Sequence, residues 1–558
     1  MSGGHKRAVA WLGRLPRPPT WAVLLALIWT LEIYFVQEIT LIPGHWQSLF
    51  GAAIYKIVRL GIDLLACAAL LCALPRAALV ALFAINPLFY GAVILYNDYY
   101  QQPLSIHAIL ETSGEGVQVS NAVWGLVDAW MAVFLVTFAI KLGLLVRGGA
   151  RAPWAARRRP AAALFAGYVG LVAVVNPLLQ PLSKIGTWDS VGGLGAIYGY
   201  SLTWLAELAY LDVDALRDRA LARARALPVD VDRLDAAEAS FPVGERIVFL
   251  QVESLDLALV DFTIDGREVT PNLNRLWRGS VRYAVQAPKG TGSSDADFRA
   301  LTGLPPSTDV PTYKIPGYPY TGSFVERLAR RGFEVLAVHG VTGEFFNRRR
   351  AYERMPFSEL VFREELLARE ISASESWAID DGVVLDYAAA RLRAAGGRHF
   401  EIVITATSHI PFPLPPGEKV FFPDEAADRF AYFDSVHYVD AAIGRFVDAL
   451  PPGTTVVLYG DHISKMENPE VGYSQRLREG EGCVPFLIHM TGRDLRGLQR
   501  TGDDLALSCE LSSLQAFRLV HRRIEASFTE APEEPGPLAG RTTPRPAESA
   551  ALVARDAY

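Results

Sequence analysis

Apolar residues in the first third of the chain fall into five long runs, each close to the roughly 20 residues that cross a bilayer as a helix. The runs lie at residues 20–42, 52–74, 76–97, 122–146 and 160–182. A signal peptide explains one such run but not five. The pattern therefore predicts an α-helical transmembrane bundle of five spans over residues 1–182.

The distribution of basic residues predicts the orientation of these spans, because cytoplasmic loops are enriched in Lys and Arg. Basic residues precede the first run and cluster between the fourth and fifth, whereas residues 97–121 contain none. We expect the N-terminus inside and everything after about residue 183 outside. The Ala-, Arg- and Gly-rich composition favours a Gram-negative bacterium, and hence an inner membrane with the distal domain in the periplasm.

Charged residues interrupt the first two apolar runs, and charge within a bilayer is unfavourable unless it snorkels or faces protein. They include Glu32, Glu38, Lys56 and Arg59. We expect them near the lipid headgroups, with a headgroup path as the alternative for the two glutamates.

The segments on either side of the distal domain have different patterns. Residues 183–244 place apolar residues at helical spacing with charge on the other face, which predicts a juxtamembrane amphipathic linker. The alternative is a solvated linker helix. Residues 527–558 are rich in Pro, Glu and small residues and predict a disordered tail.

From residue 245 to about 526, short β-rich apolar runs alternate with helical stretches, which predicts an α/β domain with a mostly parallel central sheet. We expect strands at residues 246–252, 334–340, 401–407 and 454–460. In open α/β sheets, ligands bind beyond the carboxyl ends of the strands. A candidate site is therefore sought at those ends.

Each of these strand ends carries an acidic residue or a histidine. The polar residues there are Glu253, His339, Ser408, His409, Asp461 and His462. One acidic residue after a strand is ordinary in a turn, but four such ends together predict one site. Two carboxylates and an imidazole suit a divalent cation such as Zn²⁺ or Mn²⁺. We predict Glu253, Asp461 and His462 as its ligands.

A glycine-rich turn at residues 289–298, KGTGSSDADF, offers a nucleophile. Its glycines let backbone N–H groups approach a phosphate, and a helix follows. Ser294 is predicted to be a simple N-cap of that helix. Ser293 is the candidate nucleophile, one residue before the cap, and Thr291 is the reserve candidate.

Eight motifs occur in one order along the chain: FLQVESLD, VTPNLNRL, GTGSSDADF, AVHGVTGEFFNRR, ESWAIDD, TSHIPF, HYVDAAIGRF and LYGDHIS. In this order they resemble the lipoteichoic acid synthase-like phosphoglycerol transferase family of the alkaline phosphatase/sulfatase superfamily. With the predicted anchor, the resemblance covers nearly the whole chain. It implies an alkaline-phosphatase-like fold for the distal domain.

The resemblance also implies roles for individual residues. It implies that one divalent ion, Mn²⁺ in preference to Zn²⁺ or Mg²⁺, is bound by Glu253, Ser293, Asp461 and His462. It implies that Ser293 is the nucleophile and that His339, Arg348 and His409 bind the substrate, with His409 acting near the leaving or attacking oxygen.

Two positions depart from the family pattern. Ser293 stands where the family commonly has threonine, and Phe346 stands where tryptophan is expected, which leaves the shape of the headgroup pocket open. No Cys/Ser-x-Pro-x-Arg motif follows the glycine-rich turn, so a formylglycine sulfatase is disfavoured.

The sequence thus predicts a membrane-bound enzyme that transfers phosphoglycerol from phosphatidylglycerol to an envelope glycan, a lipid-linked acceptor or a polyol phosphate, through a phospho-serine intermediate. The alternatives are a phosphoethanolamine transferase, a phosphodiesterase that releases product to water, and a non-catalytic envelope-binding protein. A phosphoethanolamine transferase tends to be disulfide-rich, whereas the distal half has only Cys483 and Cys509, whose pairing stays open. The formal charge of −6 gives no basic field for nucleic acid.

Overall fold

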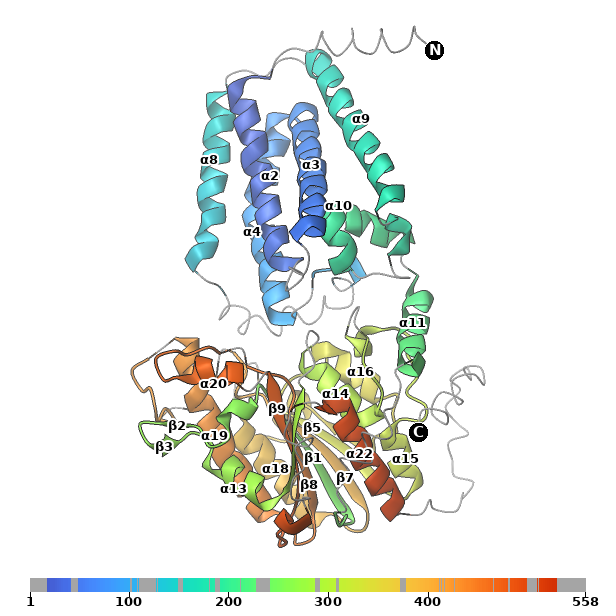
Figure 1. Cartoon of the computed structure of the whole chain (residues 1–558), viewed down its shortest axis with the longest axis vertical. Coiled ribbons are helices and arrows are strands. Elements are labelled where there is room, and N and C mark those ends of the chain that lie inside the picture. Colours follow the sequence, from blue (N-terminus) through green and yellow to red (C-terminus); the bar gives the residue numbers. More distant parts are fainter. Residues whose placement is uncertain are drawn as a thin grey trace. The chain divides into compact units, whose positions relative to one another are not determined.

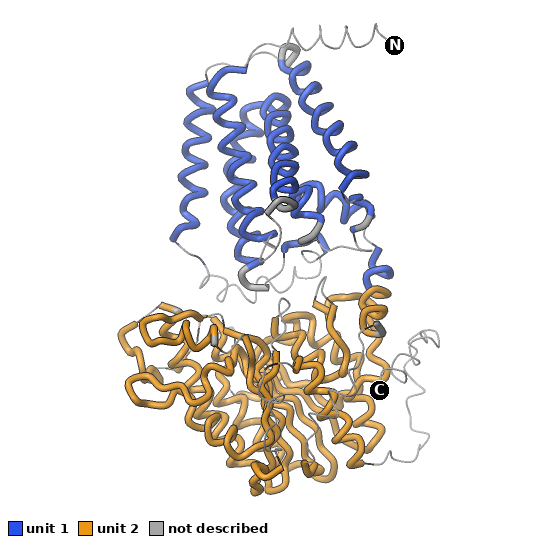
Figure 2. Tube along the Cα trace, in the orientation of Figure 1, with its two compact units in different colours: residues 1–110, 126–216 blue, residues 111–125, 217–558 orange. Residues whose placement is uncertain are grey.

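The computed structural model of the 558-residue chain divides into two compact units, which Figure 2 shows in different colours. Among the described residues, the first unit ends at Leu216 and the second begins at Arg217. The described residues are 18–41, 49–100, 103–107, 109, 127, 129–148, 154–179, 181–185, 191–210, 212–226, 241–286, 292–307, 311–371, 378–410, 412, 414–415, 417–425, 427–464, 466–479, 482–498, 509 and 511–528. The predicted tail after residue 528 lies outside them.

The first unit is a bundle of helices (Figure 1). Its helices are α2 (Thr20–Thr40), α3 (Leu49–Ala73), α4 (Arg76–Tyr100), α8 (Val133–Arg147), α9 (Trp154–Leu178) and α10 (Val191–Tyr210). Four described segments are long and apolar enough to cross a membrane: Thr20–Thr40, Arg76–Asn97, Ala129–Arg147 and Arg157–Leu178. They correspond to four of the five predicted spans.

The second predicted span, at residues 52–74, coincides with a helix that is more charged than the other four. Helix α3 occupies it, but Lys56, Arg59 and Asp63 give its helical sequence too much charge to qualify as a span by composition. Two of these charges share one ion-pair partner within the bundle, because Glu38 of α2 pairs with Lys56 at 2.6 Å and with Arg59. A second pair joins Glu32 of α2 to Lys141 of α8. The acidic residues of the first span therefore bind neighbouring helices.

The second unit contains an eight-stranded mixed sheet in the order β10-β4-β9-β8-β1-β7-β5-β6. The strands are β1 (Arg246–Val252), β4 (Val281–Gln286), β5 (Glu334–His339), β6 (Glu359–Val361), β7 (His399–Ile404), β8 (Thr455–Gly460), β9 (Cys483–Met490) and β10 (Leu511–Ser512). β9 pairs antiparallel with both β4 and β8, and the other neighbours pair in parallel. The predicted mostly parallel α/β sheet is confirmed. A separate hairpin joins β2 (Thr263–Ile264) to β3 (Arg267–Glu268).

Helices cover both faces of this sheet (Figure 1). One layer contains α13 (Pro271–Gly279), α18 (Asp381–Ala394) and α19 (Asp428–Ala449), and the other contains α14 (Ser293–Thr302), α15 (Phe324–Arg330) and α22 (Ser513–Ser527). Shorter helices are α16 (Arg348–Tyr352), α17 (Arg363–Ala368) and α20 (Tyr473–Glu479), and α11 (Val213–Ala226) precedes the domain. Because both faces are covered, β1 is buried from Ile247 to Val252, as its unbroken apolar run requires.

Strand β7 ends earlier than predicted, at Ile404 instead of residue 407. The backbone beyond it finds other partners. The Asp381 carboxylate accepts hydrogen bonds from the backbone N–H groups of Ala406 and Thr407, both at 2.8 Å. These bonds turn the chain away from the ladder just before His409. The pairing that the sequence left open is also resolved, since Cys483 and Cys509 form a disulfide with their Cα atoms 6.2 Å apart.

Candidate active site

Three predicted metal ligands converge at the carboxyl edge of the sheet. Glu253, Asp461 and His462 each offer a ligand atom, and these atoms all lie within 4.8 Å of one another. The Nε2 atom of His462 is 3.3 Å from Glu253 Oε1 and 3.5 Å from Asp461 Oδ2. The arrangement follows from the ladder, because Val252 pairs with Gly460. Glu253 and Asp461 directly follow the last residues of two adjacent parallel strands.

The loop that carries Glu253 is held from several sides. Its backbone N–H donates to Thr405 Oγ1 at 2.9 Å, and its carbonyl accepts from Ser408 Oγ at 2.6 Å. Ser254 has a left-handed φ of 52°, a conformation that non-glycine residues seldom adopt. In that conformation, its N–H donates to Asp461 Oδ1 and its hydroxyl donates to Glu253 Oε1, both at 2.8 Å. The turn thus orients both carboxylates.

The charges of the cluster shift one another's pKa values. Burial raises the pKa of Asp461 to about 7, and the Glu253 carboxylate adds to the rise. Burial alone would lower the pKa of His462, but the Asp461 and Glu253 carboxylates raise it to about 10. Burial opposes ionisation of Glu253, yet the positive His462 holds the pKa of Glu253 well below its ordinary value. Two buried carboxylates therefore gather around one positive charge.

These donors fit a divalent cation. Asp461 Oδ2 is buried and accepts no hydrogen bond from the described residues. Two carboxylates and an imidazole, each with an atom facing the same point, are a donor set for Mn²⁺ or Zn²⁺. A cation there would satisfy the open oxygen and offset the paired negative charges.

Ser293 lies beside this cluster. Its Oγ donates to Glu253 Oε2 at 2.8 Å and is 3.5 Å from His462 Nε2. Its carbonyl accepts from Gln251 Nε2 at 3.1 Å, and Gln251 in turn accepts from the Tyr459 hydroxyl at 3.1 Å. Two side chains from β1 and β8 therefore position the start of α14.

The predicted capping of α14 is wrong. The helix begins at Ser293 itself, and the N-cap is Gly292, whose φ is 74°. Glycine adopts this backbone conformation without strain. The buried Oγ of Ser294, the predicted cap, has no hydrogen-bond partner among the described residues. The reserve nucleophile Thr291 lies outside the described residues.

Arg348 reaches the site as half of a buried ion pair. Its Nε donates to Asp297 Oδ2 at 2.8 Å, and the two side chains are 1% and 0% exposed. The Tyr352 hydroxyl also donates to Asp297. Sequence reasoning missed Asp297, although it lies four residues after Ser293 in α14, where residues share one helix face. That spacing was an available signal.

The remaining predicted residues surround the same cluster. His339 ends β5, its Nδ1 is 2.9 Å from the Ile404 carbonyl, and its Nε2 is 3.5 Å from Arg348 Nη1. Burial, reinforced by the Arg348 guanidinium, lowers the pKa of His339 to about 3, so the ring is neutral. His409 is half-buried and close enough to lower the pKa of Glu253. Apart from the reserve candidate Thr291, the predicted site residues all lie in this neighbourhood.

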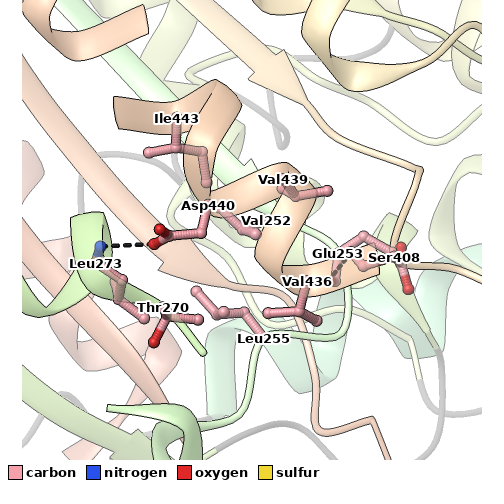
Figure 3. A pocket seen from close by; sticks show the side chains of 10 residues that line it. All are labelled: Val252, Glu253, Leu255, Thr270, Leu273, Ser408, Val436, Val439, Asp440 and Ile443. Atoms are coloured by element: carbon pink, nitrogen blue, oxygen red, sulfur yellow. Dashed lines mark hydrogen bonds between the residues drawn. The ribbon is translucent and has the colours of Figure 1, made fainter. Parts of the chain in front are cut away.

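A small cavity lies behind Glu253, between β1 and α19 (Figure 3). It has a volume of about 10 Å³ and is lined by Val252, Glu253, Leu255, Thr270, Leu273, Ser408, Val436, Val439, Asp440 and Ile443. At its far end, Asp440 Oδ1 accepts from the Leu273 N–H at 2.7 Å, which ties α19 to the start of α13. A space of this size holds one water molecule at most. It therefore offers no room for a substrate.

A known protein family matches the part of the chain that forms this site. A family model described as sulfatase matches residues 245–502, the stretch that contains the sheet and the clustered side chains. This stretch is therefore similar to a sulfatase domain. The likeness to sulfatases that the sequence predicted is thereby confirmed.

The sequence similarity to one relative extends beyond this domain. The chain is 22% identical over 456 residues to lipoteichoic acid synthase 2 of Bacillus subtilis, which covers 75% of the chain and 68% of that protein. It is 25% identical over 259 residues to the lipoteichoic acid synthase of Staphylococcus saprophyticus, which covers 43% of the chain and 39% of that protein. The match to the second relative is thus much shorter than that protein.

A solved structure resembles the architecture of both units. The integral membrane lipooligosaccharide phosphoethanolamine transferase A of Neisseria meningitidis superposes with a TM-score of 0.52 and 14% identity, covering 90% of this chain and 95% of that one. At this identity the likeness concerns the fold alone. The fold is a bundle of apolar helices followed by an α/β domain with a mostly parallel mixed sheet.

Proposed function

We propose that the protein is a membrane-bound, metal-dependent phosphotransferase that moves phosphoglycerol from phosphatidylglycerol to an envelope glycan, a lipid-linked acceptor or a polyol phosphate. One observation supports it most: the Ser293 hydroxyl, at the start of α14, lies 2.8 Å from Glu253 in a cluster with Asp461 and His462. A hydroxyl beside such a donor set is the arrangement of an activated nucleophile.

The proposed reaction has two steps. In the first, Ser293 loses its proton to water and its Oγ bonds to phosphorus, while the bond from phosphorus to the diacylglycerol oxygen breaks. His409 supplies the proton that this leaving oxygen takes up. In the second, the oxygen of an acceptor hydroxyl bonds to phosphorus while the bond from phosphorus to Ser293 Oγ breaks. The acceptor's proton passes to His409, and Ser293 regains a proton from water. A divalent cation held by Glu253, Asp461 and His462 supplies Lewis acidity, which favours the alkoxide and offsets phosphate charge.

Arg348 is suited to hold the transferred phosphate. Its Nε is engaged by Asp297, while its buried Nη2 has no hydrogen-bond partner among the described residues. A guanidinium fixed on one edge presents its other N–H groups as a preformed fork for phosphate oxygens. The neutral His339 ring lies beside the same guanidinium and completes the proposed headgroup contact.

The proposed location is the periplasmic side of a bacterial inner membrane. The apolar helices of the first unit support a membrane anchor. The disulfide between Cys483 and Cys509 supports an oxidising compartment for the distal domain, because such bonds persist outside the cytoplasm. A lipid donor is confined to the bilayer, so anchoring raises its effective concentration at the enzyme.

Phosphoethanolamine transfer is the second candidate. The likeness of fold to the Neisseria phosphoethanolamine transferase favours it. Phe346 at the expected tryptophan position leaves the headgroup pocket open to either alcohol. Both candidates use the same nucleophile and differ only in the headgroup that becomes attached to it.

The deciding experiment incubates the purified full chain in detergent with phosphatidylglycerol or phosphatidylethanolamine labelled in the headgroup, each with Mn²⁺. We expect the glycerol label on the peptide that contains Ser293, and no labelling in Ser293→Ala. Ser294→Ala is the matched control and should label normally. An ethanolamine label would select the second candidate, and a fully active Ser293→Ala would overturn the mechanism. Release of label to water without any effect of acceptor would identify a phosphodiesterase.

A further inference from the structure

A second group of polar side chains lies at the amino edge of the sheet, opposite the edge that carries the Ser293 cluster. Glu334 is the first residue of β5, and His399 is the first residue of β7. In the parallel ladder between these strands, Glu334 pairs with His399 and Leu336 pairs with Glu401. Alternate residues of a strand share one face of a sheet. The side chains of Glu334, His399 and Glu401 therefore all lie on the same face.

A pocket with a volume of about 490 Å³ adjoins this group. It lies between the starts of β5 and β7 and the second half of α18. Its lining residues are Glu334, Tyr387, Ala390, Arg391, Ala394, Ala395, Gly396 and His399. The small side chains among them leave enough space for a metal ion together with bound water molecules.

His399 forms a buried pair with Glu401. The two side chains are 2% and 0% exposed, and His399 Nε2 is 3.2 Å from Glu401 Oε2. Because a carboxylate accepts hydrogen bonds, the proton of the neutral imidazole lies on Nε2. This tautomer leaves the lone pair of the ring on Nδ1. Histidines that bind metals commonly donate their other ring N–H to a carboxylate in this way.

The Nδ1 atom of His399 is the open donor of the group. It is buried and has no hydrogen-bond partner among the described residues. It lies 3.4 Å from Oε2 of Glu334, whose side chain is 50% exposed. Two ligand atoms that are each about 2.1 Å from a tetrahedral Zn²⁺ lie about 3.4 Å apart. The imidazole nitrogen and the carboxylate oxygen thus have the separation of two ligands of one metal ion.

The charges around the pocket favour a cation. Arg391 is the arginine that lines the pocket, and it is engaged by Glu359 of β6 at 2.5 Å. Within the described ranges, the ion pairs of Glu334 and Glu401 are both with His399. Burial raises the pKa of Glu401, as expected for a carboxylate without a fixed positive partner. A neutral His399 therefore leaves two carboxylates that a cation would stabilise.

We propose that Glu334 and His399 bind a transition-metal cation, such as Zn²⁺, at the amino edge of the sheet, with Glu401 as the positioning residue of the imidazole. Water molecules in the pocket complete the coordination. The cation joins the starts of β5 and β7. The site shares no residue with the catalytic cluster, and it does not rest on the function proposed above.

The test measures binding of Zn²⁺ to the full chain in detergent by equilibrium dialysis. Asp461→Asn/His462→Gln removes two ligands of the proposed catalytic ion and is the background for every measurement. We expect this protein to bind one Zn²⁺ per chain. Adding Glu334→Gln should weaken binding about tenfold or more, and the half-exposed position of this side chain makes misfolding of the variant an unimportant risk. The matched control is Glu470→Gln, which changes an exposed carboxylate and should leave binding unchanged.

Two further variants test the histidine and its positioning residue. His399→Gln should abolish binding. Glu401→Gln should lower the affinity about tenfold but still bind one Zn²⁺ per chain at saturation, because the amide oxygen accepts the same hydrogen bond without the charge. Thermal unfolding in chelator compares the folding of these variants without metal. An unchanged affinity in Glu401→Gln would contradict its positioning role.

Three results would overturn the proposal as a whole: an unchanged affinity in Glu334→Gln, an equal loss in Glu470→Gln, or no binding of Zn²⁺ by the background protein. In the last case, His399 serves only as a bridge between two carboxylates. The measurement uses no substrate. A failure of Ser293 as nucleophile would therefore be seen separately, in the labelling experiment.

Discussion

Asp297 and Arg348 form an ion pair with both side chains buried, at 2.8 Å, one helical turn beyond Ser293. The pair connects α14 to the start of α16, and it fixes the guanidinium that is proposed to hold the transferred phosphate. Removing one partner leaves an uncompensated buried charge, which typically costs more than the pair contributes in stability.

Asp297→Asn should therefore lower both stability and turnover. We expect a loss of about 3 kcal/mol in the opening free energy of α14 and α16, measured by hydrogen exchange, together with a fall in kcat. Asp448→Asn is the control, because Asp448 pairs with Arg275 on the exposed surface, and it should change neither quantity. Equal protection factors in the two variants would show that the buried pair has no structural importance.

Divalent metal should stabilise the domain through Glu253, Asp461 and His462. At a Mn²⁺ concentration 100 times its Kd, mass action predicts a stabilisation of about 2.7 kcal/mol, seen as a higher midpoint of thermal unfolding. Asp461→Asn should abolish most of the rise, and chelator should reverse it in the wild type. Asp448→Asn should respond as the wild type does. A metal response that survives in Asp461→Asn would place the cation elsewhere, and parallel titrations with Zn²⁺ and Mg²⁺ would rank the metals.

His521 should make the domain less stable in mild acid. It is buried in α22, stacked on Phe324 with ring centres 3.7 Å apart, and its Nε2 is 2.9 Å from the Ala300 carbonyl. Burial, with Arg327 nearby, holds the pKa of His521 well below its ordinary value. The folded state thus binds fewer protons than the unfolded state below pH 6.5, so stability falls as pH falls.

The expected contribution of His521 is a loss of about 1.4 kcal/mol between pH 7.5 and 5.5. His521→Gln should reduce the pH dependence of unfolding by this amount, even if its stability at pH 7.5 is lower. Identical slopes for wild type and His521→Gln would contradict the assignment.

Reductant should destabilise the domain through the disulfide between Cys483 and Cys509. The two cysteines are 26 residues apart, and closing a loop of that length in the unfolded chain is worth about 3 kcal/mol. With dithiothreitol, the midpoint of thermal unfolding of the wild type should fall to that of Cys483→Ala/Cys509→Ala. Reductant should leave the midpoint of this double variant unchanged. Cys67→Ala/Cys72→Ala, in α3, should still respond to reductant. Alkylation of Cys483 without prior reduction would show that the pair is open.

Much of the candidate site could be predicted because its residues follow strands. Glu253 and Asp461 each come directly after an apolar run, and parallel strands end at the same edge of a sheet. Local pattern therefore implied that the two carboxylates would meet. Ser293 was singled out by the glycine-rich turn before a helix, a signal that is also local.

Other relationships could not be predicted because they depend on which elements become neighbours. The partner of Arg348 is 51 residues away along the chain. Nothing in the sequence of the three consecutive arginines at 348–350 indicates that their side chains have different surroundings. The charged residues of α3 are a similar case. Lys56 and Arg59 are unfavourable in an apolar helix taken alone, whereas the bundle supplies Glu38 from α2.

The amino-acid sequence alone determined the order of the elements, the change from long apolar helices to an α/β sheet, and the residues at the strand ends. These features follow from the spacing of apolar side chains, which can be read from a short stretch of neighbouring residues. Only the tertiary structure decided the partners of the buried charges and the start of α14 at Ser293. A buried charge is stable only beside the group that compensates it, and that group is brought close by packing rather than by position along the chain.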